Sequence, residues 1–315
     1  QKQLLLKQNP PLPAGRGGFM LLGEEKGVDS RGADGYNESC EVEMDLEGRV
    51  AIVTGASRGV GKAMALGLAK EGAIVVVAAR TEVERPPMPG SIEVTAREIR
   101  RAGGQAHAVR CDVTDEAEVN GMVSRAIGLF GRVDVLVNNS GIAFPAHAWE
   151  MPLKRWELVL KVNLTGAFLC ARAVLPGMME RRTGSIINVS SIQATQKGSV
   201  NTGIAYGVSK AALERLTVGL AEEVRSFNIA VNCLKPRGAV STEGMAYLHA
   251  AADRSRWDTP DKMVRACVFL ASQGDGGVTG LVATDEEICE RYLNEEQAAK
   301  EEGNGAGSCP EDVRG

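Results

Sequence analysis

The feature that most constrains the fold is a regular alternation of short apolar runs and helix-like segments between residues 46 and 284. The run Ala73–Ala79 is continuous and rich in β-branched residues, which is typical of a strand buried on both faces. Further strands are expected at 49–53, 105–110, 133–137, 185–189 and 229–234, and helices at 92–102, 115–130, 154–179, 206–227 and 260–271. This alternation predicts an α/β fold: a single domain with one doubly wound parallel sheet of about seven strands, flanked by helices on both faces.

The two ends of the chain lack this alternation. Residues 1–45 contain turn and coil signals such as Pro10–Pro13 and Gly15–Gly18, and we predict a disordered N-terminal extension. From Asp285 to Gly315 the chain is acidic and then glycine-rich, which predicts a solvated tail or a short surface helix followed by coil. The ordered domain is therefore expected to span residues 46–284.

Composition argues against several classes of function. The 315 residues carry a net charge of −4, and no basic surplus points to nucleic acid or to an anionic membrane. No apolar run reaches the ~18 residues that a membrane span needs, so no span is expected. Seven scattered cysteines without a CxxC pair are typical of reduced thiols in the cytoplasm or another reducing intracellular compartment. The three histidines are not at ligand spacing, so no metal site is expected.

Three glycines lie between the first expected strand and its helix, in the segment Thr54–Gly61. Gly55 allows a tight turn, whereas Gly59 and Gly61 remove side chains where a pyrophosphate and the neighbouring strand come close. The amides at the helix start then face an anion, with the positive end of the helix dipole behind them. The spacing GxxxGxG differs from the common GxGxxG, but its position predicts a Rossmann-type dinucleotide site. The predicted contacts of this turn are Gly55, Ser57, Arg58, Gly59, Val60 and Gly61.

The residue that follows the second strand bears on the choice of cofactor. An acidic residue there would accept hydrogen bonds from a ribose 2′-hydroxyl and repel a 2′-phosphate, but this chain has Arg80. Arg58 in the glycine turn could reach the same phosphate. Two guanidinium groups favour NADP(H), while the nearby Glu82 and Glu84 leave NAD(H) open as the alternative. A second interpretation is that Arg80 merely solvates the end of a strand.

Tyr206 and Lys210 stand four residues apart at the start of a long helical pattern. This spacing places both side chains on one face of the helix. A free phenol titrates near ~10, and a lysine ammonium beside it is expected to lower the pKa of the phenol. The pair could then act as a general acid and base. The alternative is an exposed Tyr and Lys on an amphipathic helix.

Several further motifs occur in an order and spacing that make the pattern specific. They are Thr54–Gly61, Asp112–Val113, Asn138–Gly141, Asn163, Ser190–Ser191, Tyr206–Lys210 and Pro236. On these motifs, residues 46 to about 284 resemble the short-chain dehydrogenase/reductase family. The resemblance implies an NADP(H)-dependent oxidoreductase that interconverts an alcohol and its carbonyl by hydride transfer. A catalytically silent dinucleotide-binding regulatory or scaffold protein is the alternative.

The resemblance also implies roles for individual residues in holding the cofactor. Asp112, followed by Val113, would contact the adenine side. Asn139, Ser140 and Gly141 would form a turn beneath the cofactor, although the family usually has Ala in place of this serine. Val240 and Thr242 are expected as contacts after the sixth strand, and both Tyr206 and Lys210 as contacts at the nicotinamide end.

Four residues are implied as catalytic. Tyr206 would exchange the proton of the alcohol, and Lys210 would hold the nicotinamide ribose and lower the pKa of the phenol. Ser191 would hydrogen-bond the substrate oxygen, with Ser190 as the alternative because the gap to the tyrosine is two residues longer than usual in the family. Asn163 would anchor a water molecule in the proton relay.

Some departures from the family pattern narrow the resemblance. An insertion, Glu82–Gly90, follows the second strand, and Lys235–Thr242 replaces the usual Pro-Gly segment. These features resemble the hydroxysteroid dehydrogenase-like branch and the related citronellol dehydrogenase-like enzymes. We therefore expect a small hydrophobic alcohol or carbonyl substrate beneath a lid at Glu243–Trp257. The helices expected at 154–179 and 206–227 would form the faces of a homodimer or homotetramer.

Overall fold

The computed structural model describes residues 44, 46–84, 86, 88–196, 202–248, 253–255, 257–274 and 277–293. The extension predicted at residues 1–45 lies outside this part of the chain except for Met44. The same holds for residues 294–315 of the predicted tail. The disorder predicted for residues 1–45 and the coil predicted for the end of the chain therefore stay predictions.

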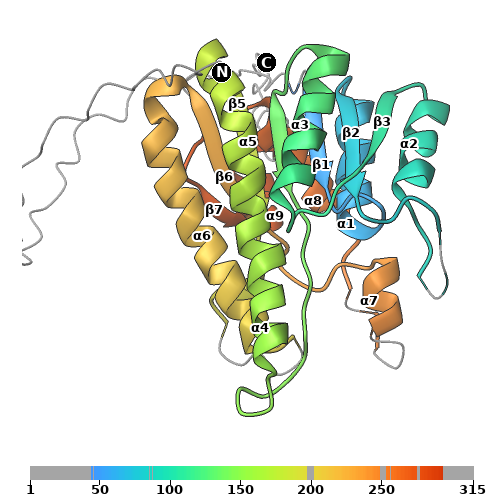
Figure 1. Ribbon diagram of the computed structural model, residues 1–315, viewed down its shortest axis with the longest axis vertical. Helices are drawn as coiled ribbons and strands as arrows, with labels where there is room; N and C mark the ends of the chain where they lie inside the picture. Colours follow the sequence, from blue (N-terminus) through green and yellow to red (C-terminus); the bar gives the residue numbers. More distant parts are fainter. Residues whose placement is uncertain are drawn as a thin grey trace, which may run out of the picture. The chain divides into compact units, whose positions relative to one another are not determined.

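The described residues form one sheet of seven parallel strands in the order β3-β2-β1-β4-β5-β6-β7 (Figure 1). The strands are β1 Val50–Thr54, β2 Ile74–Ala79, β3 Gln105–Arg110, β4 Val135–Asn138, β5 Gly184–Val189, β6 Ile229–Lys235 and β7 Val282–Thr284. The predicted fold class is confirmed. Strand order reverses between β1 and β4, so a crevice opens beyond their carboxyl ends, where doubly wound folds bind ligands.

Helices cover both faces of the sheet (Figure 1). They are α1 Gly59–Lys70, α2 Ile92–Arg101, α3 Glu116–Phe130, α4 Leu153–Leu160, α5 Gly166–Arg181, α6 Ile204–Val224, α7 Glu243–Leu248, α8 Asp261–Ser272 and α9 Asp285–Tyr292, with short 3₁₀ turns at Ile192–Ala194 and Arg225–Phe227. In β1, Ala51 and Val53 pack into one core with α1, α2, α8 and α9. Val50 and Ile52 pack into a second core with α3, α5 and α6. Central strands such as β1 and β5 thus bury both faces, which explains their largely apolar sequences, whereas β3 at the edge of the sheet is partly exposed.

The helix expected at 154–179 runs from Leu153 to Arg181, but a π-helical turn at Lys161–Thr165 interrupts its regular hydrogen bonding. By length and composition alone, this stretch is the one among the described residues that could cross a membrane. Half of its most apolar window is buried inside the fold, as in a core helix of a soluble domain, so the composition is weak evidence for a span. The π turn carries Asn163, and such turns inside α-helices frequently occur at functional sites.

From Asp285 onward a solvated tail or a short surface helix was predicted, and the structure has a helix there, but one that is partly buried. Residues 285–292 form α9, whose start is closed by a capping box between Thr284 and Glu287. Ile288 and Leu293 are buried in the same core as α1 and α8. The acidic residues that suggested a tail lie in the first turn of α9, where negative charge stabilises the positive end of the helix dipole. The ordered domain therefore extends at least to Leu293.

Replacing Ile288 with alanine tests whether α9 belongs to the core. The side chain is fully buried, so its truncation should cost about 2–4 kcal/mol of unfolding free energy. The melting temperature measured by calorimetry should then fall by roughly 4–12 °C. Glu290→Ala, an exposed position on the same helix, is the matched control and should leave it unchanged. Equal melting temperatures for the two variants would show that α9 contributes nothing to the core.

Candidate active site

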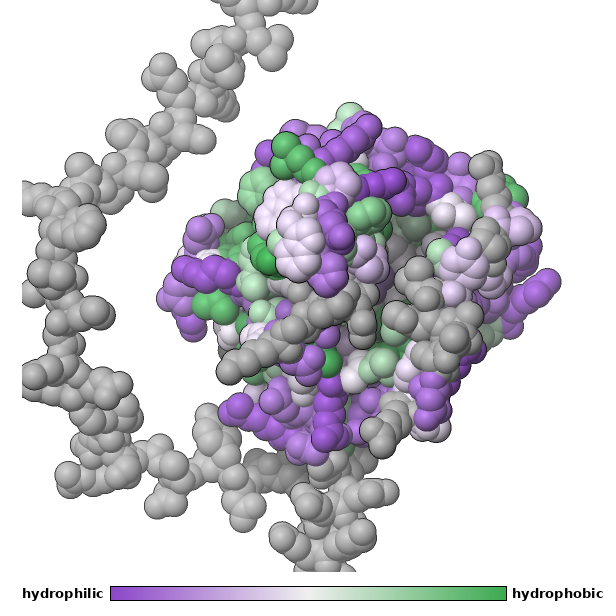
Figure 2. All heavy atoms as spheres, turned by 90° about the horizontal axis from the view of Figure 1, so that it is seen from below, coloured by the Kyte–Doolittle hydropathy of each residue, from purple (hydrophilic) through white to green (hydrophobic). Residues whose placement is uncertain are grey.

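A cavity of ≈ 490 Å³ lies beyond the carboxyl ends of the central strands. Figure 2, seen from the end of the molecule where α7 lies, shows mostly hydrophilic residues around the periphery and paler or hydrophobic residues nearer the middle. The predicted residues that line the cavity are Gly55, Ser57, Arg58, Gly59, Val60, Gly61, Arg80, Asp112, Val113, Asn139, Ser140, Gly141, Tyr206 and Thr242. Segments that are far apart in sequence therefore meet where the reversal of strand order predicts a ligand.

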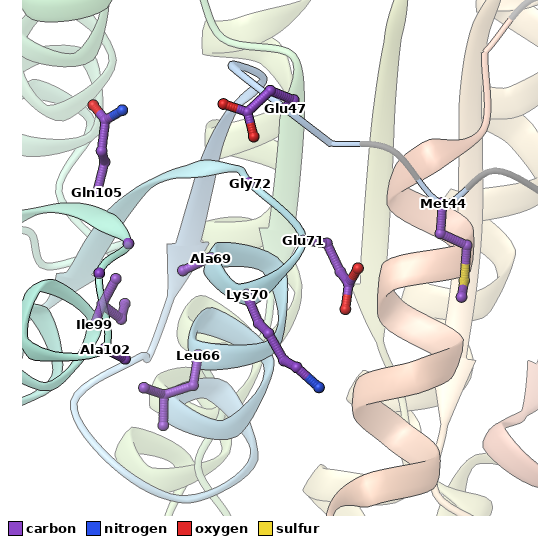
Figure 3. A pocket seen from close by; sticks show the side chains of 12 residues that line it. Met44, Glu47, Leu66, Ala69, Lys70, Glu71, Gly72, Ile99, Ala102 and Gln105 are labelled. Atoms are coloured by element: carbon purple, nitrogen blue, oxygen red, sulfur yellow. The ribbon is translucent and has the colours of Figure 1, made fainter.

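A larger hollow of ≈ 820 Å³ lies at the opposite edge of the sheet (Figure 3). It is lined by the ends of α1 and α2 and by residues that precede β2 and β3, among them Leu66, Lys70, Ile99 and Gln105. This is the amino-terminal edge of the strands, whereas ligands of doubly wound sheets bind beyond the carboxyl ends. We therefore place the candidate active site in the smaller cavity.

The floor of the cavity is formed by contacts between the loops that follow β1 and β4. The hydroxyl of Thr54 accepts hydrogen bonds from the amides of Asn139 (3.0 Å) and Ser140 (3.2 Å). The amide side chain of Asn139 donates to the carbonyls of Thr54 (3.0 Å) and Gly55 (3.3 Å). A Cβ atom at Gly61 would stand 2.2 Å from this Asn139 nitrogen, so the position requires glycine. Asn139 and Ser140, predicted to lie beneath the cofactor, are thus joined to the segment at the end of β1.

Helix α1 begins at the wall of this cavity. Gly59, its first residue, has φ +61°, and its amide donates to a carboxylate oxygen of Glu243 at 3.0 Å. That carboxylate occupies the kind of position that an anion takes at a helix amino terminus. The cradle therefore fits the pyrophosphate of a dinucleotide, and it also ties the start of α7 to the glycine turn.

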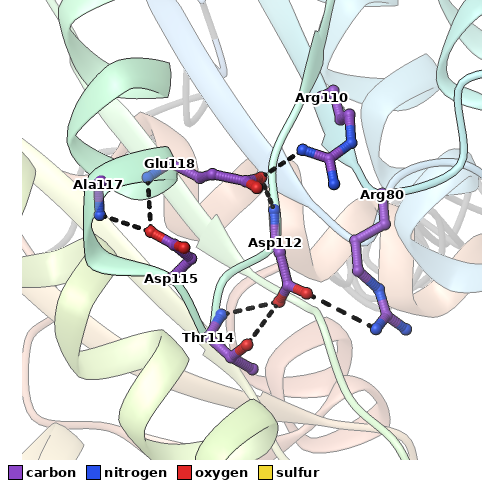
Figure 4. A network of polar contacts seen from close by, with 7 residues as sticks. All are labelled: Arg80, Arg110, Asp112, Thr114, Asp115, Ala117 and Glu118. Atoms are coloured by element: carbon purple, nitrogen blue, oxygen red, sulfur yellow. Dashed lines mark hydrogen bonds and ion pairs between the residues drawn. The ribbon is translucent and has the colours of Figure 1, made fainter.

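The far end of the cavity carries a network of charged side chains (Figure 4). Arg80 lies 3.8 Å from the carboxylate of Asp112, and its side chain is 60% exposed. Burial alone would raise the pKa of Asp112, but hydrogen bonds from the amide and hydroxyl of Thr114, together with Arg80 and Arg110, lower it overall. Asp112 therefore stays ionised at neutral pH and holds the Arg80 guanidinium beside the cavity. The structure brings these two predicted residues together.

The predicted catalytic residues also meet at one corner. Tyr206, on α6, lies close enough to the side chain of Ser191 for the serine to lower the pKa of the phenol. The ammonium of Lys210 lies 5.7 Å from the centre of the Tyr206 ring and donates to the Val189 carbonyl at 2.6 Å. Ser190, the alternative to Ser191, instead donates to Glu214 at 2.8 Å. The geometry therefore favours Ser191 as the serine beside the tyrosine.

Asn163 lies in the π turn, and its side chain contacts the loop after β4. Its oxygen accepts from the amide of Ile142 at 2.8 Å, and its nitrogen donates to the Ile142 carbonyl and to the Ser209 hydroxyl, both at 2.9 Å. A Cβ at Gly141 would lie 3.5 Å from the Lys210 nitrogen and 3.6 Å from the Asn163 oxygen. The loop after β4 thus packs directly against both residues.

The expected lowering of the Tyr206 pKa by Lys210 is wrong for this structure. Burial raises the pKa of Tyr206 above its usual value and outweighs the opposing effect of the Ser191 hydrogen bond. Burial also lowers the pKa of Lys210 to about 8, partly offset by Cys233 and Glu214. Helical spacing places the two side chains on one face, but it does not reveal how strongly the surrounding protein removes water from both.

Two predicted contacts stand apart from the cavity wall. Lys210 lies behind Tyr206 and is 3% exposed. Val240 is buried and pairs in an isolated bridge with Asp258, next to the wall but not in it. Sequence reasoning also missed some lining residues, namely Ala79, Thr81, Met88, Cys111, Ile142, Val162 and Gly244. Most of them are sequence neighbours of predicted positions, so including the residues next to each motif would have identified them.

These observations define an α/β protein of the dinucleotide-binding class. The chain belongs to the short-chain dehydrogenase family, whose model, described as short chain dehydrogenase, matches residues 49–253. Curated relatives named hydroxysteroid dehydrogenase-like protein 2 are similar: that of Bos taurus is 36% identical over 245 residues, and that of Xenopus tropicalis 34% over 243, each alignment covering 77% of this chain. The chain spans 58% of the length of each of these two relatives. The predicted family and its hydroxysteroid dehydrogenase-like branch are confirmed.

Solved structures agree with this assignment. A structure from Beutenbergia cavernae, assigned as a NAD(P) dependent gluconate 5-dehydrogenase and holding NADP at low occupancy, is 36% identical with a TM-score of 0.68. It covers 77% of this chain and 97% of its own. A short-chain type dehydrogenase/reductase from Mycobacterium marinum is 31% identical with a TM-score of 0.66, over 76% of this chain and 94% of its own. The family binds a nicotinamide dinucleotide, and the glycine cradle described above fits one.

Replacing Lys210 with methionine should stabilise the protein without ligands at pH 7. Below about pH 8 the folded protein buries a charged ammonium, which the unfolded chain hydrates more favourably. The wild type should therefore gain stability relative to Lys210→Met as pH rises from about 8 towards 10.5, because the unfolded chain then binds more protons. At pH 7 the variant should be more stable by about 1–3 kcal/mol in urea unfolding. Lys154→Met, at an exposed position, is the control and should show no such pH-dependent difference.

Proposed function

We propose that this chain is an NADP(H)-dependent oxidoreductase that interconverts an alcohol and its carbonyl, with Tyr206 as the general acid and base. One observation carries the proposal: Tyr206, with Ser191 beside it, lines a cavity that the glycine turn also lines. A proton donor therefore borders the space that fits a dinucleotide. The catalytically silent alternative would be favoured by a broken set of catalytic residues, whereas Asn163, Ser191, Tyr206 and Lys210 stand together.

The nicotinamide cofactor supplies or accepts the hydride when it is bound. The protein residues bind the substrate oxygen and manage its proton. The paired hydroxyls of Ser191 and Tyr206 would hold that oxygen, and Tyr206 would donate its proton when a carbonyl is reduced. A buried phenol with a raised pKa keeps this proton at neutral pH, which suits the acid role. Lys210 would contact the nicotinamide ribose, and Asn163 would fix the neighbouring loop through Ile142.

The preference for NADP(H) is supported by the charge at the far end of the cavity. Arg58 and Arg80 both line it. Guanidinium groups bind phosphate oxygens well because their donors match the geometry of the anion. Glu84, which had favoured NAD(H), accepts a hydrogen bond from the Gly90 amide and is held within its own loop. NADP in the Beutenbergia cavernae structure is consistent with this preference.

A hydrophobic substrate is supported by the segment after β6. Gly244, in α7, lines the cavity, and the helix continues with Met245, Ala246 and Tyr247. We propose that α7 forms part of a lid over the substrate. The branch name of the relatives, hydroxysteroid dehydrogenase-like, is compatible with an apolar ligand, but the substrate of this chain is not defined by that name.

Substitutions at the catalytic corner test the proposed chemistry. Tyr206→Phe should lower kcat by at least about 10²-fold with a panel of carbonyl substrates and NADPH, because it removes the proton donor. Binding of NADPH measured by fluorescence should change little. Ser191→Ala should also lower kcat strongly, whereas Ser190→Ala should have a small effect. Turnover that survives Tyr206→Phe would reject the proposed acid.

We also propose a homodimer or homotetramer formed through α5 and α6. These helices lie on the same face of the sheet (Figure 1) and expose Phe168, Val208 and Val218, each more than 40% exposed. Large apolar side chains repeated on one face are typical of contact between subunits.

Val218→Glu should therefore convert the oligomer into monomers in light scattering, because it places a charge in the apolar contact. Val83→Glu is the matched control, since Val83 is also exposed but lies on the loop after β2. A monomeric wild type would contradict the proposal.

A further inference from the structure

The loop inserted after β2 folds back onto the glycine turn through Gly90. The Gly90 carbonyl accepts a hydrogen bond from the Arg58 guanidinium (Nη2) at 2.9 Å. The Gly90 amide donates to the carboxylate of Glu84 at 2.7 Å. One residue thus links an acidic side chain of the loop to an arginine of the cavity wall. We call this pair of hydrogen bonds the Glu84–Gly90 clasp.

The clasp depends on a close approach of two backbone segments. Gly90 has φ +97°, a conformation that favours glycine. A Cβ atom there would stand 2.5 Å from the Ser57 carbonyl oxygen and 3.0 Å from the Cβ of Arg58. The loop is therefore pressed against the residue just before Arg58, and any other side chain at position 90 would push it away. Met88 of the same loop lines the cavity, so the loop is also part of the wall.

The Arg58 guanidinium is hydrogen-bonded through one nitrogen, whereas another of its nitrogens has no hydrogen-bond partner among the described residues. Its Nη2 donates to Gly90, while its Nε is buried and has no hydrogen-bond partner in the described part of the chain. A buried donor without a partner is costly unless a ligand or water satisfies it. Arg80 is placed differently, because it is mostly exposed and faces Asp112. Of the two arginines, Arg58 therefore depends on the loop for its orientation.

We propose that Glu84 and Gly90 are positioning residues that fix the Arg58 guanidinium for the 2′-phosphate of NADP(H). Neither residue needs to touch the reacting atoms. Glu84 holds the Gly90 peptide, the Gly90 carbonyl holds Arg58, and Arg58 binds the phosphate. The inserted loop would thereby set the preference for NADP(H) over NAD(H). This inference rests on the proposed dinucleotide site and deepens it.

Two effects of the Glu84 carboxylate, its charge and its positioning of Arg58, predict opposite changes in affinity for the 2′-phosphate when the carboxylate is removed. A negative group near a phosphate repels it, so its removal alone would strengthen binding of a 2′-phosphate. If Glu84 acts by holding the clasp, its removal frees Arg58 and weakens that binding. Glu84→Gln separates the two effects further, because glutamine loses the charge but keeps an oxygen that accepts from the Gly90 amide.

The test is calorimetric titration of the full chain with two fragments, adenosine 2′,5′-bisphosphate and adenosine 5′-monophosphate. The difference between their binding free energies gives the contribution of the 2′-phosphate. Glu84→Ala should weaken binding of the bisphosphate about tenfold, since one charge-assisted contact is worth on the order of a tenfold change in affinity. Binding of the monophosphate should stay within about twofold of the wild-type affinity. Glu84→Gln should stay close to the wild type. Glu82→Ala, an exposed glutamate of the same loop, is the matched control and should also stay close to it.

Several results would overturn the inference. One is that Glu84→Ala binds the bisphosphate as tightly as the wild type or more tightly. Another is that the substitution weakens binding of both fragments equally. A wild type that does not prefer the bisphosphate would overturn it even if the protein reduces carbonyls with NADH. Conversely, the predicted pattern of binding in a protein without turnover would support the clasp while rejecting the oxidoreductase proposal. The two proposals can therefore fail separately.

Discussion

The close approach of the loops after β1 and β4 is the constraint on which the rest of the site depends. Strand order reverses between these two strands, and the side chains of Thr54 and Asn139 join their loops through partly buried hydrogen bonds. Gly61 then lets α1 start directly against Asn139. An unpaired polar group at this depth would be costly, so the loops are held in one arrangement. The same arrangement sets the amino end of α1 and the path of the chain towards Ile142, which in turn holds Asn163.

Much of the fold could be predicted because its signals are local. The expected strand at 105–110 matches β3, and most other boundaries differ by a residue or two. Central strands such as β1 are apolar runs buried on both faces, which makes them recognisable in the sequence. β7 was not located, because Val282–Thr284 is short and is defined by its pairing with β6. The π turn inside the long helix leaves no obvious pattern in the sequence. The α9 segment was predicted to be a solvated tail or a surface helix, because its many charged residues conceal the two buried apolar positions Ile288 and Cys289.

The positions of the main residues of the candidate site could also be predicted from local motifs. Glycine spacing and the Tyr206–Lys210 pair identify where a cofactor and a proton donor would lie, because each motif has a local geometric reason. The direction of the Tyr206 pKa could not be predicted, since it is set by burial among residues from several elements. The same holds for the contact between Gly90 and Arg58, which joins positions 32 residues apart through a backbone approach that composition does not encode.

The catalytic corner combines groups that burial drives towards their neutral forms. Dehydration raises the pKa of Tyr206 and lowers that of Lys210, and the ammonium of Lys210 donates to the Val189 carbonyl. Just behind them, Glu214 forms an ion pair with Lys235 at 3.2 Å, with both side chains less than 15% exposed. The Glu214 carboxylate keeps the Lys210 pKa from falling further, and it also accepts from Ser190. Glu214 therefore connects the ammonium beneath the tyrosine to the strand end that carries Ser191. A ligand that accepts hydrogen bonds from Lys210 would favour its charged form, and so lower the pKa of the neighbouring phenol only when the site is filled.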